Sequence, residues 1–162
     1  LIGRACNRLV PSELTTSDNN VISYRWVPID LDPVRPAGIS SSDAELAEAL
    51  KMREVVAAWV CSEMKFPAPI KAVSGNGGHL LFRLPDMPVS KESTNFIRNT
   101  LEGLAEKFNS DKVKIDTVVF NPARIWKLYG TTTRKGDAVP VGNKREARPH
   151  RMSYIDDMGE KG

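Results

Sequence analysis

The sequence predicts an α+β fold whose strands and helices follow one another in the order βαββαβ. Two segments, at about 43–64 and 91–109, carry apolar residues at helical spacing. A glycine-rich turn at 74–78 joins two short apolar runs, which is the pattern of a β-hairpin. A chain of 162 residues forms one domain, or one domain with a small appendage, and is long enough to bury a core.

The first half of the chain is predicted to hold one strand and one helix. An apolar run predicts a strand from about 21 to 30 or 31, and a loop rich in proline and glycine follows at 33–38. Ser42 and Glu45 have the spacing of a capping box and mark the start of the helix. The expected apolar face of this helix consists of Leu46, Ala49, Leu50, Val56, Ala57, Val60 and Met64.

The second half supplies the remaining strands and a second helix. Strands are predicted at 70–73 and 79–84, a helix at 91–109, and further strands at 112–116 and 125–129. The expected buried stripe of the helix consists of Phe96 or Ile97, Leu101, Leu104 and Phe108. This order is the split βαβ arrangement, called ferredoxin-like or RRM-like, with an antiparallel sheet and partial accessory α/β elements around it.

Both ends of the chain are expected to lie outside this core. Residues 1–20 are interpreted as the remnant of an N-terminal module, because the chain begins with Leu1 and a turn-rich stretch precedes the first strand. Residues 21–155 form the predicted core domain. Residues 156–162 are polar and contain glycine, so we expect a flexible tail there.

Cysteine usage and hydropathy point to a cytoplasmic protein that has no membrane partner. The two cysteines, Cys6 and Cys61, stand far apart, and no CxxC motif is present, so a disulfide framework or a zinc site is not expected. No apolar run reaches the length that spans a membrane, and no signal peptide is visible.

Basic residues concentrate late in the chain, although the net charge of the whole is only +3. Between residues 124 and 151, eight Lys and Arg side chains stand against two acidic ones. This composition favours phosphates or nucleic acid, although a solvated basic loop would have the same composition. The candidate nucleic-acid contacts in this segment are Arg134, Lys135, Arg148, His150 and Arg151.

Three carboxylates are candidates for a metal site. Asp30 and Asp32 end the first strand on one face, about 7 Å apart along the chain. Asp116 ends the strand that follows the second helix, and the topology could bring it to the same sheet face. Together the three would supply hard oxygen ligands for Mg²⁺ or Mn²⁺. The alternative is that Asp32 caps a turn and Asp116 merely ends a strand.

The turn Ser74-Gly75-Asn76-Gly77-Gly78 and the histidine after it, His79, form a second candidate site. Glycines let backbone N–H groups approach a phosphate, and Ser74 adds a hydroxyl. The turn has neither the lysine of a Walker loop nor a helix after it. A plain hairpin with a half-exposed histidine is the simpler alternative.

Arg124 and Lys127 flank the start of the last predicted strand, where they could clamp a triphosphate or a template backbone. Trp126 and Tyr129 lie among these basic residues. We interpret both aromatic side chains as core or sheet packing rather than as platforms for nucleobases.

In order along the chain stand Asp30-x-Asp32, the Ser74–His79 turn, and Ile115-Asp116 with a basic strand behind it. This combination resembles the archaeo-eukaryotic primase superfamily, specifically the primase-polymerase domains of phage, plasmid and mobile-element replication proteins. The resemblance covers residues 20–151 and includes the stretches 29–40 and 148–151.

The resemblance implies template-directed nucleotidyl transfer on single-stranded DNA. Asp30, Asp32 and Asp116 would be the catalytic residues and would bind two Mg²⁺ or Mn²⁺ ions. The incoming nucleoside triphosphate would be bound by Ser74, Gly75, Asn76, Gly77, His79, Arg124 and Lys127. The implied partners are nucleoside triphosphates, a DNA template and primer, and a fused or associated helicase.

This chain has less sequence before the first motif than members of that family, which predicts that a fragment of this kind holds the metal site and is weak as a polymerase. Two other functions stay open. One is a non-catalytic RRM-like module, which would read bases with aromatic residues on its central strands. The predicted central strand residues, Lys71, Val73 and Asp116, are not aromatic. The other is a different metal-dependent nucleotide-processing enzyme on a palm-like sheet, such as a nucleotide cyclase.

Overall fold

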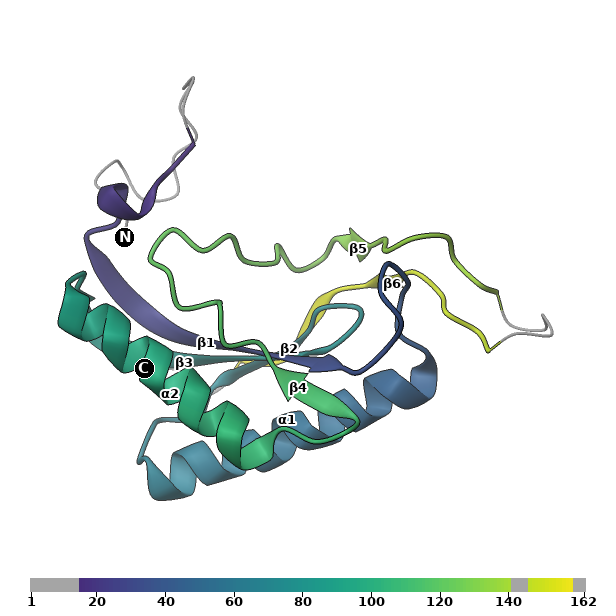
Figure 1. Ribbon diagram of the computed structural model, residues 1–162, viewed down its shortest axis with the longest axis horizontal. Coiled ribbons are helices and arrows are strands. Elements are labelled where there is room, and N and C mark those ends of the chain that lie inside the picture. The colour runs from purple at the N-terminus through teal and green to yellow at the C-terminus, as the bar shows by residue number, and fades with distance from the viewer. Residues whose placement is uncertain (1–14, 141–145, 159–162) are drawn as a thin grey trace.

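The computed structural model describes residues 15–140 and 146–158. Two helices cover one face of an antiparallel five-stranded sheet, and a long, mostly irregular segment crosses the other face (Figure 1). This segment comprises residues 116–140, and we call it the crossing segment. The elements in chain order are η1 (Asp18–Asn20), β1 (Ser23–Pro33), α1 (Asp43–Glu63), β2 (Ile70–Val73), β3 (Gly78–Pro88), α2 (Lys91–Phe108), β4 (Val113–Ile115), β5 (Thr132–Thr133), β6 (Arg151–Met152) and β7 (Tyr154–Asp157).

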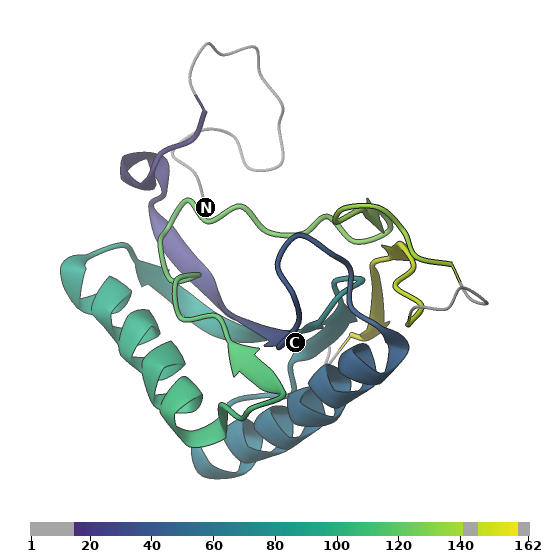
Figure 2. The same cartoon turned by 45° about the vertical axis from the view of Figure 1, so that its right-hand side comes forward.

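The strand order in the sheet is β4-β1-β3-β2-β7, and every neighbouring pair is antiparallel. The first four positions have the ferredoxin-like order, which confirms the predicted α+β fold class. β7 extends the sheet beyond β2, and β5 and β6 form a separate two-stranded ribbon. Figure 2 shows α1 and α2 together beneath the sheet, with the crossing segment above it.

The core lies between the sheet and the helices, because alternate residues of each strand face that side. Ile29 and Leu31 of β1 and Leu80 and Phe82 of β3 are at most 1% exposed. Their neighbours in the sequence face the opposite side, which we call the open face. One strand therefore contributes both to the core and to the open face.

Both helices begin where the sequence places them. Ser42 and Glu45 form the predicted capping box: the Ser42 N–H donates to the Glu45 carboxylate and the Glu45 N–H donates to Ser42 Oγ. Arg53 of α1 is not apolar and was not expected on the buried face, yet it is buried. Its guanidinium donates to Asp156 and to the carbonyl of Ala72. Of the two candidates for the start of the buried stripe of α2, Ile97 is buried, whereas Phe96 is 44% exposed.

The predicted strand at 125–129 is wrong, because this segment is irregular and pairs with no strand. It lies over the open face with Ile125 and Leu128 in solvent, while Trp126 packs against the core. The other fold differences are smaller. β1 ends at Pro33, so Asp30 and Asp32 lie within the strand.

The expected ends of the core domain are described only in part. Asp156 and Asp157 belong to β7 and not to a flexible tail, because β7 pairs with β2 and Asp156 accepts from Arg53. Residues 1–14 and 159–162 lie outside the described part of the chain, and Cys6 is among them. Within the described residues, no helix has the length and hydropathy that crossing a membrane requires.

Candidate active site

Three of the predicted site residues stand in one row across the open face. The backbone N–H of Asp116 donates to the carbonyl of Asp30 at 2.9 Å, and Asp30 is paired with His79 in the β1–β3 ladder. Residues that lie opposite one another in an antiparallel sheet project to the same face. Asp32, two residues further along β1, also faces this side and is paired with Lys114 of β4.

Each of the three carboxylates already has a basic partner. Asp30 Oδ1 lies 3.3 Å from His79 Nε2. Asp32 accepts from Arg35 Nη1 at 3.1 Å, and Asp116 pairs with Arg124 Nη2 at 3.6 Å. The charges of Arg35 and Arg124 offset part of the repulsion between the carboxylates that would otherwise oppose folding.

The donor set fits a hard divalent cation only in part. Carboxylate oxygens are the ligands that Mg²⁺ and Mn²⁺ prefer. However, no group of three or more His, Cys, Asp and Glu side chains in the described residues is close enough to hold a metal ion. Asp30 and Asp32 line a common cavity, whereas Asp116 does not. A metal would therefore bind through Asp30 and Asp32, and Asp116 could join only after leaving Arg124.

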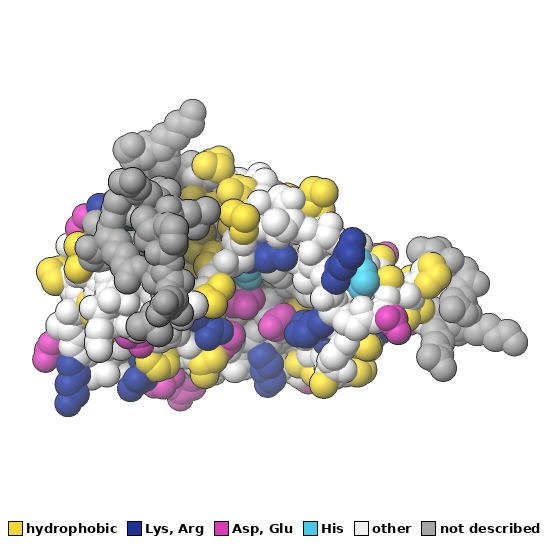
Figure 3. Space-filling view, turned by 90° about the horizontal axis from the view of Figure 1, so that it is seen from above, with side chains coloured by type: hydrophobic (Ala, Val, Ile, Leu, Met, Phe, Trp, Pro, Cys, Tyr) yellow, Lys and Arg dark blue, Asp and Glu magenta, His cyan; other side chains and the backbone are white. Residues whose placement is uncertain are grey.

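A cavity of about 430 Å³, which we call the site cavity, lies between the open face and the crossing segment. Figure 3 looks onto this face and shows acidic, basic and histidine side chains gathered in its middle. The predicted site residues that line the site cavity are Asp30, Asp32, Ser74, Asn76, His79, Arg124, Lys127 and Lys135. Arg35 joins them, so four cationic side chains face two acidic ones. This balance suits a polyanionic ligand.

The glycine-rich turn is held by its own hydrogen bonds. Ser74 Oγ accepts from the N–H groups of Asn76 and Gly77, and Asn76 Oδ1 accepts from the N–H of Ser41. Gly75 has a φ of +98°, which favours glycine. A Cβ at Gly77 would stand 2.4 Å from the carbonyl oxygen of Leu31. The glycines thus let the turn pack against β1 beside Asp32, and Gly75 and Gly77 do not line the site cavity.

His79 is buried, and both of its ring nitrogens face polar groups. Nδ1 lies 2.8 Å from the Tyr129 hydroxyl, which also accepts from Trp126 Nε1 at 3.0 Å. Because indole N–H groups only donate, the Tyr129 hydroxyl is free to donate to Nδ1. On the other side of the ring, Nε2 lies beside the Asp30 carboxylate. Trp126 lies against the imidazole with ring centroids 4.4 Å apart. Burial raises the pKa of Tyr129 to about 12, and the nearby charge of Asp30 adds to this rise.

This arrangement shows which residues the sequence analysis missed. Trp126 and Tyr129 do pack, as interpreted, but they pack on His79 and orient it toward Asp30. No local pattern shows that their segment crosses the open face. Arg35 could have been identified from the sequence, because a basic residue three positions after an aspartate can pair with it, as Arg35 does with Asp32. Thr133 reaches the turn by donating to the carbonyl of Ser74.

The remaining predicted nucleic-acid contacts lie elsewhere. Arg148 binds the Glu45 carboxylate through both terminal nitrogens, at 2.7 and 2.8 Å, and this hydrogen bonding lowers the pKa of Glu45. Arg151 donates to the carbonyl of Ser41, and His150 Nε2–H donates to the carbonyl of Gly136. Both arginines therefore anchor the C-terminal segment to the start of α1. Arg134 is exposed outside the site cavity, and nucleic-acid binding by all these residues stays a prediction.

Comparison with known proteins does not identify a family for this chain. No family model and no curated protein matches this chain. Among solved structures, the chain is similar to the polymerase domain from Mycobacterium tuberculosis Ligase D in complex with DNA, with a TM-score of 0.42 and 17% identity. The match covers 79% of this chain and 44% of that one. A similarity at this level says nothing about the activity or ligands of this chain.

Proposed function

We propose that this chain is the catalytic core of a DNA primase or primase-polymerase, which transfers nucleotides from nucleoside triphosphates onto a primer or first nucleotide on single-stranded DNA. One observation carries the proposal. Two carboxylates on one strand and four cationic side chains face the same cavity on the open face of an antiparallel sheet. Triphosphate chemistry requires positioning and neutralisation of charge, which such a cavity can supply.

Asp30 and Asp32 would hold a divalent cation, Mg²⁺ or Mn²⁺. When bound, such an ion neutralises phosphate charge and makes a hydroxyl a better nucleophile. His79 Nε2 lies 3.3 Å from Asp30 Oδ1, so the ring stands beside the carboxylate that would hold the ion. The Tyr129 hydroxyl fixes His79 in turn, as second-layer groups do around metal-binding carboxylates.

Arg124, Lys127 and Lys135 would bind the triphosphate from the side of the crossing segment. Arg124 has two roles in this proposal. It pairs with Asp116 in the protein alone at 3.6 Å, and its side chain is 38% exposed, so it can turn to a phosphate. That movement would release Asp116, whose N–H donates to the Asp30 carbonyl, and would let it act as the third carboxylate.

A non-catalytic RRM-like surface fits these observations less well. The middle of the open face carries Asp30, Asp32 and His79, whereas an RRM carries there the aromatic side chains on which bases stack.

The test is synthesis on single-stranded DNA with Mn²⁺ and labelled nucleotides, with and without a primer. The Asp30→Asn/Asp32→Asn variant is compared with Glu102→Gln, an exposed acid on α2. We expect template-dependent product from the wild type and from Glu102→Gln, and a loss of about 10³-fold in the double variant, or ~4 kcal/mol of barrier. Product that forms equally without template would indicate a template-independent enzyme such as a cyclase, and full activity of the double variant would reject the site.

A further inference from the structure

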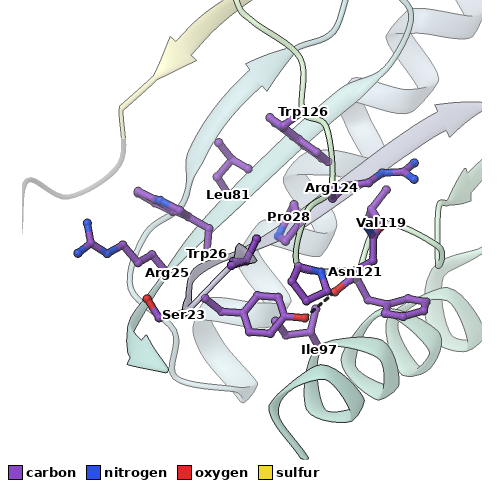
Figure 4. A pocket seen from close by; sticks show the side chains of 14 residues that line it. Ser23, Arg25, Trp26, Pro28, Leu81, Ile97, Val119, Asn121, Arg124 and Trp126 are labelled. Carbon is purple, nitrogen blue, oxygen red and sulfur yellow. Dashed lines mark hydrogen bonds between the residues drawn. The ribbon is translucent and has the colours of Figure 1, made fainter. Parts of the chain in front are cut away.

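A second cavity, of about 460 Å³, adjoins the site cavity on the open face and has a different character. Figure 4 shows Pro28 and Leu81 of the sheet between the indole rings of Trp26 and Trp126. Val119 of the crossing segment lies on the other side. We call this space the apolar cavity. Its volume lies within the range of small-molecule pockets, about 300–1,000 Å³.

The walls of the apolar cavity suit a flat, uncharged ring system attached to an anion. Among the described residues that line it there is no Asp or Glu, and Arg124 supplies positive charge where it borders the site cavity, whereas Arg25 is paired with Asp86. Aromatic and apolar side chains form most of the lining. Nucleobases bind to such surfaces because every base has an apolar face that can stack on an aromatic ring.

The two cavities are adjacent. Val119, Arg124 and Trp126 line both of them. Arg124 can therefore contact the phosphates of a molecule in the site cavity while it borders the apolar cavity, where the rest of that molecule would lie. A nucleoside triphosphate has this construction, with a polyanion at one end and a base and sugar at the other.

We propose that the apolar cavity binds the base and sugar of the same nucleoside triphosphate whose phosphates lie in the site cavity. This inference rests on the proposed function, because it takes the site cavity to be the triphosphate site. It adds a location for the nucleoside and assigns Trp26 as a residue that contacts the base.

Trp26 is an aromatic residue through which the apolar cavity can be altered without changing the lining of the site cavity. Trp26 lines the apolar cavity but not the site cavity. Trp126 lines both cavities and also donates to Tyr129. The side chain of Trp26 is partly exposed, and the guanidinium of Arg83 lies 5.5 Å from its ring centre. Arg83 does not line the apolar cavity, so it holds the indole without filling the space.

The experiment compares the binding of ATP and of inorganic tripolyphosphate, each with Mg²⁺, by calorimetry. The variants are Trp26→Ala, Trp26→Phe and the control Trp59→Phe, in which the altered ring packs against Phe108. We expect Trp26→Ala to weaken ATP binding about tenfold and to leave tripolyphosphate binding unchanged, as loss of a stacked aromatic ring does. Trp26→Phe should restore most of the ATP affinity, and Trp59→Phe should match the wild type.

The inference is overturned if Trp26→Ala binds ATP as tightly as the wild type does. It is also overturned if the variant loses affinity for ATP and for tripolyphosphate equally. A wild type that binds neither ATP nor tripolyphosphate would reject the proposed function itself, and the inference with it. Thermal denaturation of each variant separates a lost contact from a lost fold.

Discussion

The two faces of the sheet differ in what they bury, although the same strands form both. On the helix-covered face, Ile29 and Leu31 of β1 are almost fully buried against apolar neighbours. On the open face, Asp30 and Asp32 of the same strand remain partly accessible and are paired with His79 and Arg35. Alternation along one strand thus places a hydrophobic core on one face and a charged cavity on the other.

This difference shows how the chain separates stability from chemistry. The helix-covered face loses water on folding and supplies most of the favourable free energy. The open face keeps charged side chains partly hydrated, with Asp32 and Asp116 paired to Arg35 and Arg124, and it has further cationic side chains that can bind an anionic ligand. The following predictions test that separation.

The largest effect should come from two neighbours on β3 that face opposite ways. Phe82 is fully buried beneath the helices, so Phe82→Ala should lower the free energy of unfolding by about 3–5 kcal/mol. Leu81 faces the apolar cavity, so Leu81→Ala should cost only about 1 kcal/mol. Urea unfolding measures both. Equal losses would show that the two faces contribute alike to stability.

The next effect tests the contact between the glycine-rich turn and β1. A Cβ at Gly77 would clash with the Leu31 carbonyl, so Gly77→Ala should destabilise the protein by about 2 kcal/mol. Gly103 on α2 has open space around it, and Gly103→Ala should stabilise the helix by about 0.5–1 kcal/mol. If the two variants unfold at the same urea concentration, the turn does not pack as described.

A smaller effect on stability, with a distinct effect on function, is expected from Tyr129→Phe. The variant removes the hydroxyl that bonds His79 and accepts from Trp126, which should cost about 1 kcal/mol of stability. Because His79 then turns more freely beside Asp30, Mn²⁺-dependent synthesis should fall about tenfold. Synthesis at the wild-type rate, with a normal dependence on Mn²⁺, would show that the hydroxyl does not position the site.

The smallest effect is a change in titration at high pH. Burial raises the pKa of Tyr129 to about 12 in the folded protein, so the unfolded chain loses this proton first as the pH rises. Tyr129 therefore contributes to stability below pH 10, and this contribution is lost between about pH 10 and 12. Absorbance titrations of the wild type and Tyr129→Phe should coincide to about pH 11 and separate above it. Curves that already separate near pH 10 would contradict the burial of this phenol.

The sequence predicted the helix-covered face well, because that face depends on local patterns. The capping box at Ser42, the hairpin and the apolar stripe of α2 were all recognisable from spacing alone. The choice between Phe96 and Ile97 could not be made, since either fits the helical period. The orientation of α2 against the sheet decides which of the two side chains is buried.

The open face was predicted only in part, because its arrangement depends on contacts between distant residues. Asp30, Asp32, Ser74 and His79 were found from short motifs, and they do meet at one cavity. The apolar run at 125–129 has the composition of a strand, yet it lies over the open face and pairs with none of the described strands. The partners Glu45 and Asp43 of Arg148 and Arg151 lie more than 100 residues away, so their ion pairs were not foreseeable.

The central claim is that the site cavity binds a metal–nucleotide complex through Asp30 and Asp32. Calorimetric titration of ATP, with and without Mn²⁺, into the wild type and into Asp30→Asn/Asp32→Asn tests it most directly. The account predicts that Mn²⁺ tightens ATP binding to the wild type and not to the double variant. ATP binding that Mn²⁺ leaves unchanged in the wild type, or tightens equally in both proteins, would contradict it.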